Sequence, residues 1–234
     1  MMTKDVTAPR RGDTRTRLIL AAERLFGDRG IHGVTLKEIN AAAGQRNESA
    51  LHYHFGSKNA LIDAILRHRV TDLDRRRQEL LDELVARGAE GDLRALLRAT
   101  FMPLLELLAS ADGVRFIRFM AGVLHDPDFD LPTLALRSEF AGISRSNAMI
   151  VSALGDLPPE IAIQRQRFLI EMTLSSLAIW THHHEAVAEV AARELFIANL
   201  FDSIMGFVTA PVSEETLDAL KRAAAAPKKR EKKS

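Results

Sequence analysis

The chain has 234 residues, of which 47% are hydrophobic and 27% charged, and its formal net charge is +1; this is an ordinary composition for one large or two small folded domains. The absence of cysteine excludes disulfides, thiolate metal sites and cysteine nucleophiles. The first twenty residues have no apolar core, and charged residues interrupt every long apolar run. We therefore expect no signal peptide, no transmembrane helix, no membrane partner and a cytoplasmic location.

The charge is unevenly distributed along the chain. Residues 1–60 contain 10 Lys and Arg against 6 Asp and Glu, residues 61–220 contain 15 against 24, and residues 221–234 contain 7 against 1. A basic N-terminal segment on an acidic body indicates that one end of the molecule meets a polyanion such as DNA. A chance asymmetry on a solvated surface is the alternative at this point.

The first predicted element is an amphipathic helix from about residue 13 to 29. Its apolar residues recur at i, i+3, i+4, i+7 and i+8, the spacing of one helix face. They are Leu18, Ala21, Ala22, Leu25 and Phe26. Gly30 follows, and a glycine at this position supplies the left-handed conformation that ends a helix.

Two short helices are predicted next. Thr35 and Glu38 have the spacing of a capping box, which starts a helix that continues to residue 43 and stops at Gly44. Asn47 is a favourable N-cap for a second short helix over about 48–54. The apolar residues of the two helices, which we expect in the core, are Leu36, Ile39, Leu51 and Phe55.

The rest of the chain has the pattern of longer helices. Ser57 caps a helix that runs from residue 58 towards 87. Beyond Gly88 and Gly91, Pro-containing breaks separate predicted helices over about 92–110, 113–125, 133–153, 159–183, 189–209 and 214–224. No segment has a convincing strand pattern. The predicted fold class is therefore all-α, with a small N-terminal unit joined to a large helical body.

Residues 35–54 carry the functional signal. A short capped helix, a glycine turn and a second short helix form the helix-turn-helix pattern, in which the second helix enters the major groove of DNA. The second helix carries amide, hydroxyl and imidazole side chains, which suit base edges and phosphates. A helix pair joined by glycine also occurs in proteins that never bind DNA, so the pattern alone leaves both interpretations open.

Residues 14–66 contain a series of spaced motifs. They are Ala-Ala-x-x-Leu-Phe and Arg-Gly of the first helix, Thr-x-x-x-Ile of the second, the Ala-Gly turn, Leu-x-x-His-Phe, and the Gly-Ser-Lys before the fourth helix. With these motifs, the segment resembles the N-terminal DNA-binding domain of the TetR family of transcriptional regulators. The resemblance implies a three-helix DNA-binding domain followed by a helical ligand-binding and dimerisation domain. We expect a flexible arm (1–12), a helix-turn-helix domain (13–60), an effector-binding and dimerisation domain (61–224) and a disordered basic tail (225–234).

The resemblance also implies which residues contact DNA. The matching positions are Thr35, Lys37, Asn47, Glu48, Ser49, Ala50, His52, Tyr53, His54 and Lys58, with Lys58 expected on a phosphate. This chain has one residue more between Gly44 and Lys58 than the common family spacing, and His52 replaces the usual tyrosine. Which of residues 45–48 contact bases therefore stays open, and Tyr53 and His54 have packing as an alternative role.

The helical body is expected to bind a small hydrophobic effector and a second copy of the chain. The expected pocket residues are Phe101, Met102, Leu105, Phe116, Phe119, Met120, Met149, Phe168, Met172 and Trp180, although the same residues suit an ordinary core. Arg115 and Arg118 favour an anionic ligand or lie on the surface. The expected dimer residues, on the last two long helices, are Thr173, Ser176, Leu177, Trp180, Phe196, Leu200, Ser203, Ile204 and Phe207.

No catalytic residue, cofactor or metal site is expected. His182, His183 and His184 point about 100° apart on a helix, so they cannot face one metal ion together. The predicted function is a TetR-like repressor that binds a palindromic operator as a homodimer and is released by a hydrophobic effector. The alternative is a helical small-molecule-binding or scaffold protein that no longer binds DNA.

Overall fold

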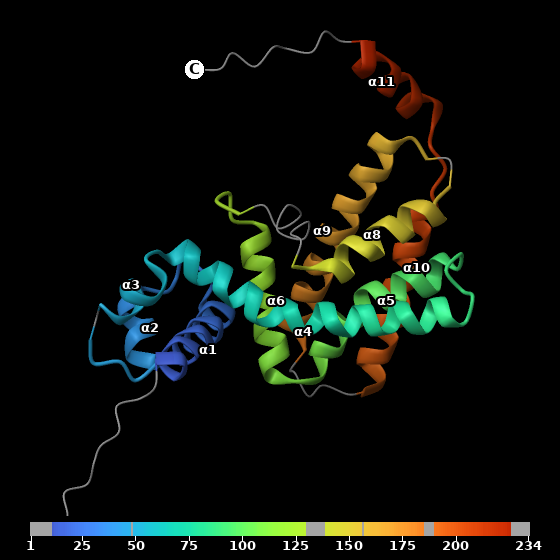
Figure 1. Ribbon diagram of the computed structural model, residues 1–234. Coiled ribbons are helices and arrows are strands. Elements are labelled where there is room, and N and C mark those ends of the chain that lie inside the picture. The colour runs from blue at the N-terminus through green and yellow to red at the C-terminus, as the bar shows by residue number, and fades with distance from the viewer. Residues whose placement is uncertain (1–10, 48, 130–138, 156, 185–189, 226–234) are drawn as a thin grey trace, which may run out of the picture.

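The computed structural model describes residues 11–47, 49–129, 139–155, 157–184 and 190–225, and all regular structure in these ranges is helical (Figure 1). The predicted all-α class is thus confirmed. The helices are α1 (Arg11–Arg29), α2 (Leu36–Ala42), α3 (Ala50–Phe55), α4 (Lys58–Ala86), α5 (Leu93–Glu106), a 3₁₀ turn (Leu107–Ala109), α6 (Ala111–Leu124), α8 (Ala141–Ala153), α9 (Pro159–His183), α10 (Val190–Thr209) and α11 (Glu214–Ala225). The predicted tail and most of the predicted arm lie outside the described residues.

The helices of the N-terminal unit begin and end where local caps require. Thr35 accepts a hydrogen bond from the Glu38 amide (3.3 Å), and the Glu38 carboxylate accepts one from the Thr35 amide (2.8 Å), so the predicted capping box starts α2. The Ser57 hydroxyl accepts a hydrogen bond from the Ala60 amide (3.1 Å) at the start of α4. Gly30 has the left-handed φ of 75° that the end of α1 requires.

The predicted start of the third helix is wrong by two residues. Asn47 Oδ1 accepts a hydrogen bond from the Ser49 amide (2.9 Å), and the Asn47 carbonyl accepts one from the Ala50 amide (3.1 Å). Asn47 therefore closes a turn before the helix instead of capping it. The helix itself begins at Ala50, after Ser49, whose side chain makes no capping hydrogen bond.

The N-terminal unit has its own apolar core. Helix α1 packs against α2 and α4, and α3 packs against α2 and α4. The fully buried residues include Leu18, Phe26, Ile39, Leu51 and Leu61. Leu25, Leu36 and Phe55, also expected in the core, are only partly buried.

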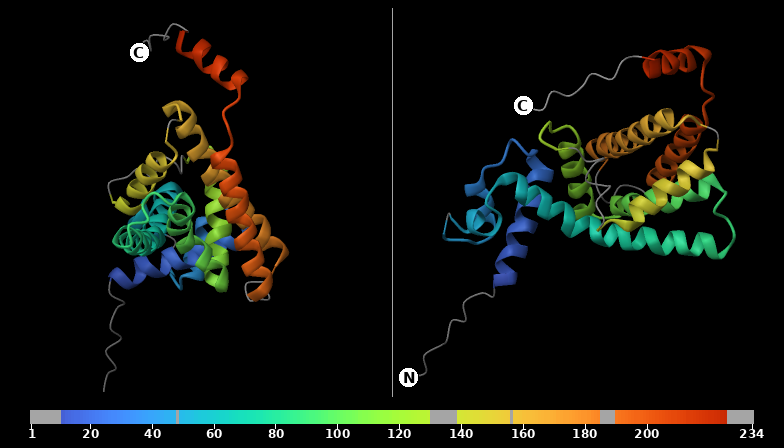
Figure 2. Two further views of the ribbon diagram at one scale, coloured as in Figure 1. Left: turned by 90° about the vertical axis from the view of Figure 1, so that its right-hand side faces the viewer. Right: turned by 45° about the horizontal axis from the view of Figure 1, so that its top comes forward.

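One continuous helix joins this unit to the body. Figure 2 shows α4 leaving the N-terminal helices and continuing along the body, while α1 lies against α6. Gly27 of α1 sits so close to α6 that a Cβ atom there would overlap the Arg115 carbonyl oxygen. The carboxylate of Glu23, on α1, is buried and forms an ion pair with Arg69 of α4 at 2.6 Å. The N-terminal unit and the body are thus packed directly against each other.

The body differs from the sequence expectations at two helix ends. The predicted helix over 92–110 ends at Glu106, and α6 begins earlier than expected because the Ser110 hydroxyl accepts a hydrogen bond from the Gly113 amide (3.1 Å). The predicted helix over 133–153 is not continuous, because Glu139 and Phe140 are not helical and α8 starts at Ala141. No single helix in the described ranges is long and apolar enough to cross a membrane, although the bent pair α10 and α11 passes that test together.

Candidate DNA interface and ligand cavity

Helix α3 lies at the end of the molecule remote from α11 (Figure 1). His52 and Tyr53 are exposed, and Tyr53 keeps 66% of its surface accessible. The Tyr53 ring contacts the half-buried His54 edge-on, with 5.2 Å between ring centroids. This exposure argues against core packing as the role of Tyr53.

The remaining expected DNA contacts fall into three groups. Thr35, Lys37, Asn47 and Ser49 are exposed, and Ala50 is half-buried at the start of α3. Glu48 lies outside the described residues. Lys58 is half-buried: its ammonium group donates to the carbonyl oxygens of Ile31 (2.6 Å) and Val34 (3.1 Å) and lies 5.4 Å from the Phe26 ring centre.

Lys58 is therefore engaged inside the protein. Because α4 starts beside the turn that follows α1, the ammonium group donates to two carbonyls there, and its expected phosphate contact stays a prediction. Sequence analysis missed Arg15, an exposed residue of α1 whose guanidinium lies 5.1 Å from the ring centre of Phe55 in α3. This contact places a cation beside α3, and only the tertiary structure reveals it.

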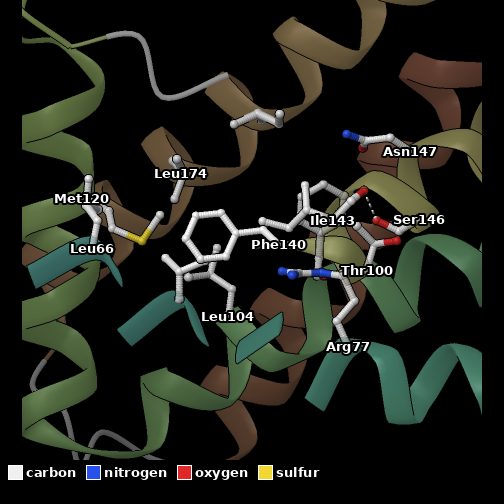
Figure 3. A pocket seen from close by; sticks show the side chains of 13 residues that line it. Leu66, Arg77, Thr100, Leu104, Met120, Phe140, Ile143, Ser146, Asn147 and Leu174 are labelled. Atoms are coloured by element: carbon white, nitrogen blue, oxygen red, sulfur yellow. Dashed lines mark hydrogen bonds between the residues drawn. The ribbon is translucent and has the colours of Figure 1, made fainter. Parts of the chain in front are cut away.

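The body contains a cavity of about 130 Å³ between α4, α5, α6, α8 and α9 (Figure 3). Its lining residues are Leu66, Val70, Arg77, Thr100, Phe101, Leu104, Met120, Phe140, Ile143, Ser146, Asn147, Ile170 and Leu174. Figure 3 shows Leu66, Met120 and Leu174 at one end of the cavity and Arg77, Ser146 and Asn147 at the other. The cavity thus has an apolar end and a polar end.

Only two of the ten expected pocket residues, Phe101 and Met120, line this cavity. Leu105, Phe116, Phe119 and Trp180 are buried elsewhere in the core, and Met102, Met149 and Met172 pack against that core. Phe168 is 51% exposed on α9. Helical spacing shows that such residues are apolar, but it cannot tell which side of a buried helix faces an open space.

Arg115 and Arg118 do not face the cavity. Arg115 forms an ion pair with Asp112, and Arg118 donates to the backbone carbonyl and the hydroxyl of Thr181. The arginine that does line the cavity is Arg77. Burial lowers the pKa of its guanidinium, and the neighbouring Asp74 opposes that effect.

The expected dimer residues need a similar correction. Thr173, Leu177, Trp180, Leu200 and Ile204 are buried within the single chain, so they are core residues with no surface left for a partner. Phe196 and Phe207 are partly buried against the core, Ser176 is half-buried and Ser203 is exposed. The large apolar side chains that do lie exposed on α9 and α10 are Ile163, Phe168, Ile179, Val190 and Leu195.

The histidine run lies at the end of α9. His182 and His183 are exposed, whereas the His184 ring stacks on Trp180 with 4.5 Å between centroids. Across the described ranges, no group of three or more His, Asp or Glu side chains is arranged to hold a metal ion.

Comparisons with known proteins agree with this geometry. Residues 18–65 match the family of bacterial regulatory proteins of the tetR type. The chain is 40% identical over 85 residues to the HTH-type transcriptional repressor KstR2 of Rhodococcus jostii (strain RHA1), and 37% identical over 95 residues to the probable HTH-type transcriptional regulator ArpR of Pseudomonas putida. These matches cover 36% and 40% of this chain and 38% and 43% of the relatives, so the chain spans about two fifths of their length.

Solved structures resemble a larger part of the chain. A crystal structure described as a TetR-family regulator from Shewanella sp. PV-4 has a TM-score of 0.58 and 18% identity, covering 81% of this chain and 97% of that one. A second, from Mesorhizobium loti MAFF303099, has a TM-score of 0.53 and 18% identity, covering 86% and 98%. At this identity they show a shared fold. The helix-turn-helix at residues 18–65 is thus similar to that of TetR-family bacterial regulatory proteins, and the fold as a whole resembles the two solved structures.

Proposed function

We propose that this protein is a transcriptional repressor that binds a palindromic DNA operator as a homodimer and leaves it when a small, mainly hydrophobic effector binds the body. The observation that carries the proposal is that one helix, α4, belongs to both regions. It contributes Leu61 to the core of the helix-turn-helix, and Leu66, Val70 and Arg77 to the wall of the cavity. We propose residues 13–60 as the DNA-binding domain and 61–224 as the effector and dimerisation domain. A role on chromosomal DNA also supports a cytoplasmic location. It further supports a function in the regulation of transcription, and not as an enzyme.

The exposed face of α3 supports DNA binding. His52 and Tyr53 offer hydrogen-bonding groups and a ring on a helix that, in a helix-turn-helix, enters the major groove. The exposed Thr35 and Lys37 of the preceding turn and helix suit the phosphate backbone, and Arg15 adds a cation beside α3. We therefore expect base contacts from α3 and phosphate contacts from α1 and α2.

The exposed apolar side chains of α9 and α10 support a homodimer. Ile163, Phe168, Ile179 and Leu195 each keep more than half of their surface accessible in the single chain. A second copy related by a two-fold axis would cover the same residues on both subunits. Such a dimer presents two α3 helices about one DNA turn apart, which requires a palindromic site.

Release by an effector requires that the ligand binds one arrangement of the body more tightly than another. The cavity provides a place for this, because its wall includes α4. A displacement of α4 would move the N-terminal unit, since Glu23 and Arg69 join α1 to α4 and Lys58 joins α4 to the turn after α1. The ligand would thereby change the spacing of the two α3 helices.

The test is selection of duplexes from a random pool by the purified full-length protein, followed by sequencing. We expect a palindrome whose half-sites are centred about one turn apart. A double variant, H52A and Y53A, should lose the enrichment while its melting temperature stays unchanged, because His52 and Tyr53 are exposed. The surface variant H183A is the matched control and should select the same palindrome.

The same experiment decides between the proposal and the scaffold alternative. Enrichment without symmetry would retain DNA binding but contradict the dimer geometry. A folded wild-type protein that enriches no sequence and shows no salt-sensitive retention on DNA would contradict the proposal and favour the scaffold.

A further inference from the structure

The polar end of the cavity contains a buried ion pair. Asp74 Oδ1 and Arg77 Nη1 of α4 are 3.0 Å apart, and their side chains are 3% and 10% exposed. The Arg77 Nε group donates a hydrogen bond to the Thr100 carbonyl oxygen at 2.9 Å. One carboxylate and one guanidinium thus neutralise each other beside the cavity.

Asp74 also holds the start of α8. Its two carboxylate oxygens accept hydrogen bonds from the amides of Gly142 and Ile143, both at 2.8 Å, and from the Gln78 side chain at 3.0 Å. A Cβ atom at Gly142 would lie 2.8 Å from the Asp74 backbone and side-chain oxygens, so glycine permits this close approach. The negative charge of Asp74 is therefore fully engaged and is held in place by α8.

Arg77 is less fully engaged. Within the described residues, its Nη2 group makes no hydrogen bond, and neither does the side-chain amide of Asn147. Both residues line the cavity and lie at its polar end (Figure 3). The hydroxyl groups of Thr100 and Ser146 donate to the carbonyls of Leu96 and Ile143. The hydrogen-bond donors still open to a ligand are those of Arg77 and Asn147.

The charge balance decides which ligand can use these donors. A carboxylate would place a second negative charge beside Asp74 and leave the site with a net buried charge, which costs several kcal/mol even after relaxation. A carbonyl oxygen accepts the same hydrogen bond without adding charge. The remaining walls, including Phe101, Met120 and Leu174, suit an apolar body. A cavity of roughly 150 Å³ accommodates benzene in a protein core, and the volume here is similar.

We propose that the cavity binds a small, neutral, mainly apolar molecule with one carbonyl-type acceptor, which takes its hydrogen bond from Arg77, and that it discriminates against carboxylates. This assignment rests on the proposed function in one respect, that the bound molecule is the effector. Recognition by Arg77 itself depends only on the cavity.

The test uses three probes of nearly equal size: acetophenone, benzoate and isopropylbenzene. Binding to the full-length protein is measured by NMR titration at neutral pH, where benzoate is ionised. We expect acetophenone to bind about tenfold or more tightly than benzoate, and also more tightly than isopropylbenzene, which has no acceptor. Benzoate binding as tightly as acetophenone would overturn the proposal, as would equal binding of acetophenone and isopropylbenzene.

A charge variant sharpens the test. D74N removes the negative charge that balances the Arg77 guanidinium, but keeps one side-chain oxygen that can accept a hydrogen bond from the α8 amides. The D74N variant should therefore bind benzoate more tightly than acetophenone. D82N is the matched control, because Asp82 also lies on α4 and pairs with Arg145 of α8, but at an exposed site outside the cavity. It should leave the wild-type order unchanged.

The results separate the two proposals. Folded D74N that keeps the wild-type order would contradict the role of charge balance. If D74N does not fold, the wild-type order of the three probes still decides. A folded wild-type protein that binds none of the probes would reject the cavity as a ligand site. The duplex selection uses no probe, so its success or failure reports on DNA binding alone.

Discussion

The N-terminal unit and the body differ in what they leave exposed. Outside its core, the N-terminal unit shows mainly polar side chains, with Leu20 and Tyr53 as its large exposed hydrophobic residues in the described ranges. The body exposes a series of large apolar side chains on α9 and α10 and also encloses a cavity. The surface of the N-terminal unit therefore suits a charged, hydrated partner. The body suits two apolar partners of different size, a protein on the exposed side chains of α9 and α10 and a small molecule in the cavity.

The two regions meet at a junction to which both contribute side chains. Phe26 of α1 stacks near Phe119 of α6, with 6.0 Å between ring centroids. The ion pair between Glu23 and Arg69 lies in the same junction, with Arg69 5.9 Å from the Phe116 ring centre. Changes here test how firmly the regions are joined, and changes on α9 test what the body binds.

The largest expected effect is on dimerisation. A glutamate at exposed Ile179 would place an unpaired charge in the proposed interface, so we expect I179E to weaken the dimer by about 100-fold or more. Sedimentation equilibrium measures the change. V85E is the matched control, because Val85 is also an exposed apolar residue but lies on α4. A dimer of unchanged strength in I179E would place the interface elsewhere.

The second prediction concerns the junction. E23Q removes a carboxylate that is 4% exposed and leaves Arg69 without its partner. Breaking a fully buried pair costs about 3–5 kcal/mol, and we expect a loss somewhat below this, because Arg69 is 30% exposed. The measurement is urea unfolding. E79Q breaks exposed pairs with Arg75 and Arg76 and should cost no more than about 0.5 kcal/mol. Equal losses in the two variants would show that the junction adds little stability.

The third prediction tests close packing between α1 and α6. G27A forces the two helices apart, because the added Cβ overlaps the Arg115 carbonyl, and should destabilise the protein by about 1–3 kcal/mol. G122A is the matched control on α6: its Cβ would meet only the Ile31 side chain at ordinary contact distances. This control should be neutral or stabilising, by up to about 1 kcal/mol. Tolerance of G27A would mean that the junction adjusts freely.

The smallest effect concerns the cap of α2. Hydrogen bonds from Thr35, together with Arg29, lower the pKa of Glu38 from 4.5 to about 2. Because the folded pKa is depressed, the stabilisation is fully present above about pH 4.5 and is lost as the pH falls towards 2. Comparison of acid unfolding of the wild type and E38Q measures it. The difference between them should shrink across this interval, and a constant difference would contradict the assignment.

The success of the sequence predictions follows the same division between regions. Capping at Thr35 and Ser57 and the end of α1 at Gly30 involve partners within four residues, so the pattern alone predicts them. The predicted start of α3 was wrong because Asn47 can either cap a helix or close a turn, and the local sequence does not decide between these two roles. The hydrogen bonds of Lys58 to the Ile31 and Val34 carbonyls were not predictable from local sequence, because these partners lie more than twenty residues away in the chain.

In the body, the important partners are distant in sequence. The start of α8 depends on Asp74, 68 residues before Gly142, and no local signal marks it. Helices α9 and α10 are apolar on several sides, so the pattern does not show which side enters the protein's own core. Because of that ambiguity, the sequence pattern predicts an interface role for Leu177 and Ile204, although both are buried in the single chain.

The sequence by itself determined the all-α class, the helix-turn-helix and its similarity to TetR-family regulators, because these depend on periodicity, caps and motifs that act over a few residues. The tertiary structure alone decided the junction at Glu23 and Gly27, the walls of the cavity and the balanced charge of Arg77 beside it. These features join side chains from helices that are far apart in the chain. The strength of the interactions between these side chains depends on folding, which excludes water from between them and fixes which charges lie close together.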